Sequence, residues 1–132
     1  MGALRIAAVV GAAAALAQVT AVAAGGPPAT VAPTAGQRAA IIKGFGDPPA
    51  ASPCMRVGLA ASNRSYATVR PKLTRACQRW AFNGTNVIKR GAGNRWRVVF
   101  EGSSYKCPRP AIPRLVQHEL GICPIARTAT TY

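Results

Sequence analysis

The sequence predicts an α+β fold with one N-terminal helix, a small antiparallel sheet of three to four strands, a short C-terminal helix and two disulfides. A Thr-x-x-Gln pattern at 34–37 is typical of a helix start, because the two side chains can cap backbone N–H groups reciprocally. Apolar and polar residues alternate over 95–101 behind a Gly-rich loop, which predicts one strand of a hairpin. Pro113 and Gly121 enclose a short segment in the way that Pro and Gly enclose many helices.

The first 24 residues have the three-part pattern of a secretory signal peptide. Arg5 gives a positive start, residues 6–17 are an apolar run rich in Ala and Val, and small residues at 21–24 offer a cleavage site. The alternative is an uncleaved membrane anchor, which the polar residues at 18 and 20 disfavour. We therefore predict a signal peptide over 1–24, no stable membrane anchor after its removal, and a protein that is secreted or associated with the cell envelope.

The rest of the chain is long enough for one domain with its own core. Gly and Pro are frequent over 25–33, which predicts a flexible linker over 25–34. We expect a single α+β domain over 35–124 and a flexible tail over 125–132.

The first helix is expected over 35–44. Ile41, Ile42 and Phe45 lie on one side of it at helical spacing, so they are candidates for the core. The Pro-rich segment 46–53 ends the helix and is expected to be a loop.

Two strands are expected next, over 54–60 and 66–70, with a polar turn at 62–65 between them. Segment 72–81 fits either a short helical turn or a loop packed on the core. Its apolar residues are Leu73, Ala76, Cys77 and Trp80.

A hairpin is expected from strands over 86–90 and 95–101, joined by residues 91–94. In the second strand, Trp96, Val98 and Phe100 form the alternating apolar set, so all three are expected to face the core. A shift of one residue would turn these side chains outward, and the pattern therefore fixes the register.

The last helix is expected over 113–120. Its apolar face comprises Leu115, Val116 and Leu120. Gly121 follows the helix, and Ile122 is placed to fold back on Val116 in a Schellman stop.

Four cysteines, which allow three pairings, are expected to form two disulfides. We favour Cys54–Cys77 and Cys107–Cys123, because each bond then joins neighbouring segments. The sequence has no Cys-x-x-Cys pair, so we expect no zinc cluster and assign the cysteines a structural role in an oxidising compartment.

The chain is strongly basic, with 17 Lys and Arg residues against three acids and a net charge of +14. Only Arg5 among the cations lies in the predicted signal peptide, so the exported domain keeps nearly all of this charge. Such a domain attracts nucleic acid, acidic wall polymers and anionic lipid headgroups. A GC-rich bacterial genome is an alternative source of the Arg excess, but that bias does not explain the scarcity of acids.

Basic and aromatic residues interleave between positions 64 and 97. We expect the aromatic rings to pack in the core and the cations to be exposed, so contact with a polyanion is electrostatic and involves no specific reading of nucleic-acid bases. Arg90 and Arg95 flank the hairpin loop and are expected side by side at its tip. The predicted polyanion-binding residues are Arg70, Lys89, Arg90, Arg95 and Arg97.

Few residues are available for catalysis, since the acids are Asp47, Glu101 and Glu119 and the one histidine is His118. We therefore expect no catalytic triad, no phosphate-cradling Gly loop, no metal site and no cofactor. Glu119, on a short helix, is expected to be a solvated charge. An enzymatic alternative is a small secreted ribonuclease with Glu101 as the base and His118 as the acid.

Three runs carry a resemblance to a group of proteins: YATVR at 66–70, RWRVVFEGSSYKCP at 95–108 and VQHELGIC at 116–123. Together they resemble small exported four-cysteine proteins of actinobacteria, a group without an established activity, and the resemblance covers residues 36–123. It implies export and a compact fold, and it implies no catalytic residue.

These observations lead us to expect a non-catalytic protein that binds an anionic envelope polymer or another polyanion. The alternatives are the ribonuclease and a secreted inhibitor or toxin-like protein, in which an exposed loop binds to a partner protein.

Overall fold

The structure, a computed structural model, describes residues 30–124, which form five strands and two α-helices. The predicted α+β class is confirmed, but the sheet has five strands rather than three to four, and three 3₁₀-helices add to the two α-helices within these residues. The strands are β1 (Thr30–Val31), β2 (Met55–Ala60), β3 (Tyr66–Pro71), β4 (Thr85–Arg90) and β5 (Trp96–Gly102). The helices are α1 (Ala35–Phe45), α2 (Arg114–Glu119), η1 (Pro49–Cys54), η2 (Arg75–Trp80) and η3 (Ala92–Asn94).

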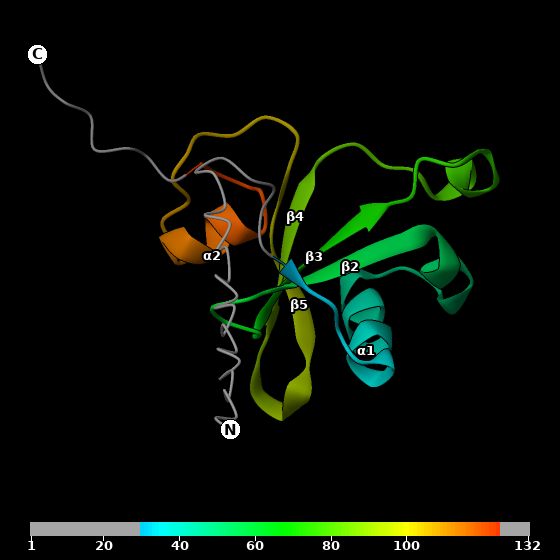
Figure 1. The fold of residues 1–132 in the computed structure, drawn as a ribbon, viewed down its shortest axis with the longest axis horizontal. Helices are drawn as coiled ribbons and strands as arrows, with labels where there is room; N and C mark the ends of the chain where they lie inside the picture. Colours follow the sequence, from blue (N-terminus) through cyan, green and yellow to red (C-terminus); the bar gives the residue numbers. More distant parts are fainter. Residues whose placement is uncertain (1–29, 125–132) are drawn as a thin grey trace, which may run out of the picture.

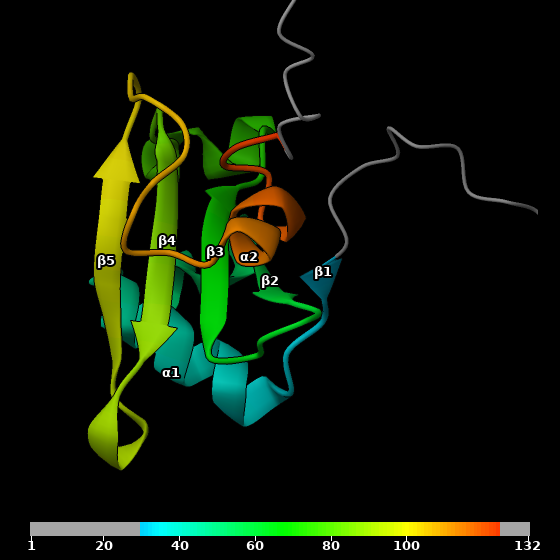
Figure 2. The ribbon, with the colours of Figure 1, turned by 90° about the vertical axis from the view of Figure 1, so that its left-hand side faces the viewer.

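The strands form one antiparallel sheet in the order β1-β2-β3-β4-β5. Figures 1 and 2 show α1 and α2 on opposite sides of it. Each helix covers a separate apolar cluster, which we call the α1-side core and the α2-side core. The α1-side core includes Ile41, Ile42, Met55, Leu59, Val69, Ile88 and Trp96. The α2-side core includes Tyr66, Val87, Phe100, Ile112, Val116, Leu120 and Ile122.

Strand β1 lies where the sequence predicted a linker over 25–34. Thr30 pairs with Ala60 and Val31 with Leu59, so these two residues extend the sheet. A strand of two residues shows no alternation of apolar and polar side chains, and the sequence pattern therefore could not reveal it. The remainder of the predicted linker, the signal peptide over 1–24 and the tail over 125–132 lie outside the described residues.

Helix α1 begins as predicted, with a complete capping box. The Thr34 N–H donates to Gln37 Oε1 at 2.9 Å, and the Gln37 N–H donates to Thr34 Oγ1 at 3.2 Å. The helix ends one residue later than predicted, at Phe45, because Gly46 adopts a left-handed conformation with φ of 98°.

The predicted loop over 46–53 contains the 3₁₀-helix η1, and the ambiguous segment 72–81 contains η2. Within that second segment Cys77 is buried and Trp80 packs at the margin of the α1-side core. Leu73 is 89% exposed and takes no part in this packing. The segment is therefore held by the disulfide at Cys77 and by the packing of Trp80.

Strand β5 changes face along its length, which corrects the prediction that Trp96, Val98 and Phe100 face one core. Val87 pairs with Phe100 but Ile88 pairs with Val98, so Val99 is an extra residue in a β-bulge. Trp96 consequently packs in the α1-side core and Phe100 in the α2-side core, while Val98 is 37% exposed. Strict alternation predicted the wrong faces because one inserted residue reverses it.

Helix α2 is shorter than the predicted 113–120, but its C-terminal stop is the predicted one. The Ile122 N–H donates to the Gln117 carbonyl at 2.8 Å, and the Gly121 N–H donates to the His118 carbonyl at 3.0 Å, which together form a Schellman motif. Val116 is buried as expected, whereas Leu115 is 49% exposed.

Both predicted disulfides are present. Cys54 bonds to Cys77, joining η1 to η2, and Cys107 bonds to Cys123, joining the segment after β5 to the end of α2. Two disulfides indicate an oxidising environment outside the cytoplasm. Over residues 30–124, no helix is long and apolar enough to cross a membrane.

Gly44 sets the distance between α1 and β5. A Cβ atom there would lie 2.5 Å from the Trp96 carbonyl oxygen and 2.6 Å from Trp96 Cβ. We expect Gly44→Ala to lower the free energy of unfolding by about 1–2 kcal/mol, since overpacking outweighs the gain in helix propensity. Urea unfolding measures this change.

Gly36→Ala is the matched control in the same helix, because a Cβ at Gly36 meets nothing within 4 Å. It is expected to leave stability unchanged or raise it by up to about 1 kcal/mol. Equal stability of the two variants would contradict the close approach at Gly44.

Candidate anion-binding surface

The β4–β5 hairpin holds four of the five predicted polyanion-binding residues. Lys89 lies directly opposite Arg97, and Arg90 lies opposite Trp96, so Arg90 is not the partner of Arg95 as expected. The hairpin instead closes through the Gly91 N–H, which donates to the Arg95 carbonyl at 2.7 Å. Lys89, Arg95 and Arg97 are exposed, and Arg90 is half-buried.

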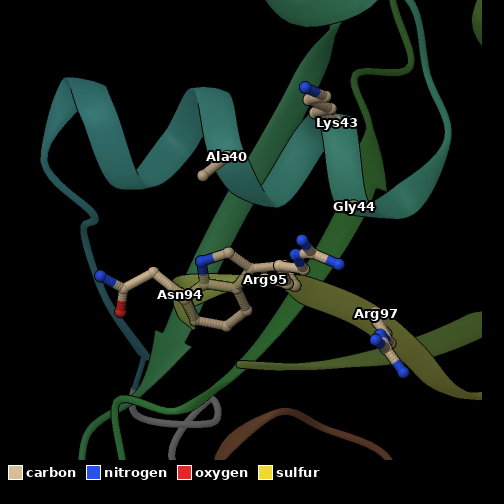
Figure 3. Close-up of a pocket in the computed structure, with 7 residues that line it drawn as sticks. Ala40, Lys43, Gly44, Asn94, Arg95 and Arg97 are labelled. Atoms are coloured by element: carbon tan, nitrogen blue, oxygen red, sulfur yellow. The ribbon is translucent and has the colours of Figure 1, made fainter. Parts of the chain in front are cut away.

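A surface cavity of about 610 Å³ lies between the start of β5 and α1. Arg95 and Arg97 line it from the strand, and Lys43 lines it from the helix. Figure 3 shows Lys43 and Gly44 on the helix, above the strand residues Arg95 and Arg97, with Asn94 at the loop end. Three basic residues from two elements that are distant in sequence therefore border this cavity. Arg95 and Arg97 alternate with the buried Trp96, so their side chains project toward the opposite face of the sheet, on which Lys89 lies.

Aromatic rings lie close to the charged groups of Lys89 and Arg90. Lys89 Nζ lies 5.3 Å from the centroid of the Tyr66 ring, and Arg90 Cζ lies 6.0 Å from the Trp96 ring. Both rings are buried, as expected, so they hold cations in place and offer no open face on which a nucleic-acid base could stack. We call Lys43, Lys89, Arg90, Arg95 and Arg97 the hairpin cations.

Arg70, the fifth predicted residue, lies apart from this group. It follows Tyr66 by four residues along β3, roughly 13 Å at the usual rise per residue. Its Nη2 donates to the Leu120 carbonyl at 2.8 Å, and its partner across the sheet is Arg56. The sequence alone gives no reason to select Lys43 or Arg56, because their positions depend on which strand a helix covers and on strand register.

The structure does not bring the two residues of the ribonuclease alternative together. Phe100 packs in the α2-side core, so the next residue, Glu101, projects to the α1 side, where it lies opposite Asn86. His118 belongs to α2, which covers the other face (Figure 2). This placement does not favour a shared site for the two residues.

Glu119 is buried rather than solvated, which corrects the prediction. Its Oε1 and Oε2 each accept the Ser62 N–H at 3.1 Å, and Oε2 also accepts the Ser62 hydroxyl at 2.7 Å. The carboxylate thus ties the β2–β3 turn to α2, a role that helix periodicity alone does not reveal.

Asp47 lies beside an apolar cavity of about 490 Å³ at the end of α1. Its Oδ2 is buried without a hydrogen-bond partner among the described residues, and desolvation raises the pKa of this carboxyl above its usual range. Elsewhere in residues 30–124, no cluster of three His, Cys, Asp or Glu side chains is arranged to hold a metal ion.

Comparison of the chain with protein-family models, with curated proteins and with solved structures gives no match.

Replacing Asp47 by Asn should stabilise the protein slightly at pH 7. A raised pKa means that the folded state holds the proton more tightly, so ionised Asp47 lowers stability above its folded pKa. The advantage of Asp47→Asn should therefore shrink as the pH falls and vanish near pH 3, where the carboxyl is protonated in both states. Urea unfolding of both proteins between pH 3 and 7 tests this, and a constant difference would contradict it.

Proposed function

We propose that this is an exported, non-catalytic protein that binds an anionic polymer of the cell envelope, or another polyanion, through the hairpin cations. The observation that carries the proposal is the pair Lys89 and Arg97, which lie directly opposite each other on the hairpin and line a shared cavity, while Lys43, Arg95 and Arg97 border a second one. Like charges placed directly opposite each other destabilise a sheet, and a bound anionic group relieves their repulsion.

Asp47 lines a cavity together with Lys43, but the other two acids lie away from the cations on the hairpin strands. Glu119 is buried under Ser62, and Glu101 follows Arg97 by four residues, roughly 13 Å along β5. The hydrogen-bond partners of the arginine side chains within residues 30–124 are backbone carbonyls and one hydroxyl. Their positive charge remains available to an external anion.

The mode of contact follows from the burial of the aromatic rings. Trp96, Tyr66 and Phe100 are at most 9% exposed, so the surface presents cations without stacking platforms. Binding of this kind depends steeply on salt concentration and little on the sequence of a nucleic acid. The predicted signal peptide and the two disulfides support export, and they make envelope polymers the ligands that we favour. The inhibitor or toxin-like alternative stays a prediction, since no contact favours it.

The test measures the affinity of the oxidised, exported protein for linear polyphosphate as a function of salt. The double variant Arg95→Gln/Arg97→Gln should weaken binding at low salt and reduce the slope of log K against log salt by roughly one to two units, since two phosphate contacts are lost.

The control is Arg75→Gln/Arg114→Gln, which removes the same charge from exposed residues away from the hairpin. It should change the slope by much less. Equal effects of the two double variants would mean that only total charge matters and would refute the proposed surface.

A further inference from the structure

Two arginines face each other on neighbouring strands, far from the hairpin. Arg56 on β2 lies directly opposite Arg70 on β3. Directly opposite residues in an antiparallel pair project on the same face with Cβ atoms about 5 Å apart, so two cations there repel each other. The fold thus places an unfavourable pair at an ordered position.

Both arginines line one concave surface region of about 610 Å³, bordered by β1, β2, β3 and the end of α2. Thr68, which is only 4% exposed, also lines it, as does Thr30. Gly58 keeps the floor open, since a Cβ there would come 2.8 Å from Thr30 Cβ. The cavity therefore combines two cations with hydroxyl groups and is shaped for a small polar ligand.

Arg70 is held in place at this cavity. Its Nη2 donates to the Leu120 carbonyl at 2.8 Å, which uses one of the five N–H donors of the guanidinium. The side chain of Arg56 is exposed. Two guanidinium groups, one anchored and one adjustable, suit an oxyanion that accepts several hydrogen bonds at once.

Glu119 is the one acid in the cavity wall. Its oxygens already accept hydrogen bonds from the Ser62 N–H and hydroxyl. Two arginines and one carboxylate leave the cavity wall with a net positive charge. Glu119 lowers this charge but does not cancel it.

We propose that Arg56 and Arg70 form a discrete site for one compact oxyanion, a phosphate or carboxylate group, separate from the hairpin cations. The site is concave and takes a single group, whereas the hairpin surface is suited to a chain of charges. This proposal goes beyond the polymer binding proposed above and does not depend on it.

The test titrates inorganic phosphate, and separately acetate, into the ¹⁵N-labelled oxidised protein at constant ionic strength, with NMR shifts as the readout. We expect saturable shifts at Arg56, Arg70 and Thr68. Tighter binding of phosphate would assign the site to phosphate groups, and tighter binding of acetate would assign it to carboxylates. Shifts that grow linearly without saturation for both anions would overturn the proposal.

Variants locate the site. Arg56→Gln should weaken the affinity about tenfold or more, because charge-assisted hydrogen bonds are lost. Arg56→Lys keeps the charge but not the planar guanidinium, so it should lose less affinity than Arg56→Gln. This variant tests the site if Arg56→Gln fails to fold. Arg75→Gln removes an equal charge elsewhere and should change the affinity less than twofold. A loss as large as that of Arg56→Gln would refute the site.

Two further variants separate this site from its surroundings. Glu119→Gln should bind the anion several-fold more tightly, since a negative charge leaves the wall while an acceptor for Ser62 remains. Weaker binding in this variant, if it is folded, would contradict the assigned geometry. Arg95→Gln/Arg97→Gln should keep its affinity for the small anion, so this proposal and the polymer surface can fail independently.

Discussion

The change of face at Val99 is the constraint on which both sides of this sheet depend. A regular strand would send Trp96 and Phe100 into the same core, whereas the bulge gives one aromatic ring to each side. Trp96 then meets Gly44 closely enough to fix α1 on β5, which brings Lys43 beside Arg95. Phe100 packs under the segment that leads to α2. The cationic hairpin surface and the cover of the opposite face thus follow from one inserted residue.

The cavity at Arg56 and Arg70 has its origin in a second irregularity of the sheet. Strands β3 and β4 pair only at Tyr66 and Ala67. Beyond this point the buried side-chain amide of Asn86 replaces backbone pairing between the strands. Its Oδ1 accepts the Val69 N–H at 2.9 Å, and its Nδ2 donates to the Val69 carbonyl at 2.7 Å. A side chain that replaces a ladder pair satisfies the backbone while the strands diverge. The end of β3 is then free to reach α2, where Arg70 binds the Leu120 carbonyl.

Sequence reasoning succeeded where the signal is local and failed where it depends on contacts between distant segments. The capping box at Thr34, the Schellman stop at Gly121 and the two disulfides are defined by short spacings, and all are present. The bulge, strand β1 and the burial of Glu119 arise from tertiary packing. No short stretch of the sequence carries a pattern that predicts them. The Arg56–Arg70 pair is an intermediate case. A turn at 62–65 brings the two predicted strands side by side, but it does not by itself determine that Arg56 lies opposite Arg70.

The charge of the protein connects its stability with its proposed function. Residues 30–124 contain 15 Lys and Arg residues and three acids, one of them buried, so the folded state carries strong self-repulsion. Disulfides with sequence separations of 23 and 16 offset this repulsion, each by about 3 kcal/mol on the chain-entropy model, because they restrict the unfolded chain. Anions that bind the folded state add stability that grows with the logarithm of their concentration relative to the dissociation constant. Two effects therefore favour anion binding at such a surface. Each anion makes its own contacts, and it also relieves the repulsion among the cations around it.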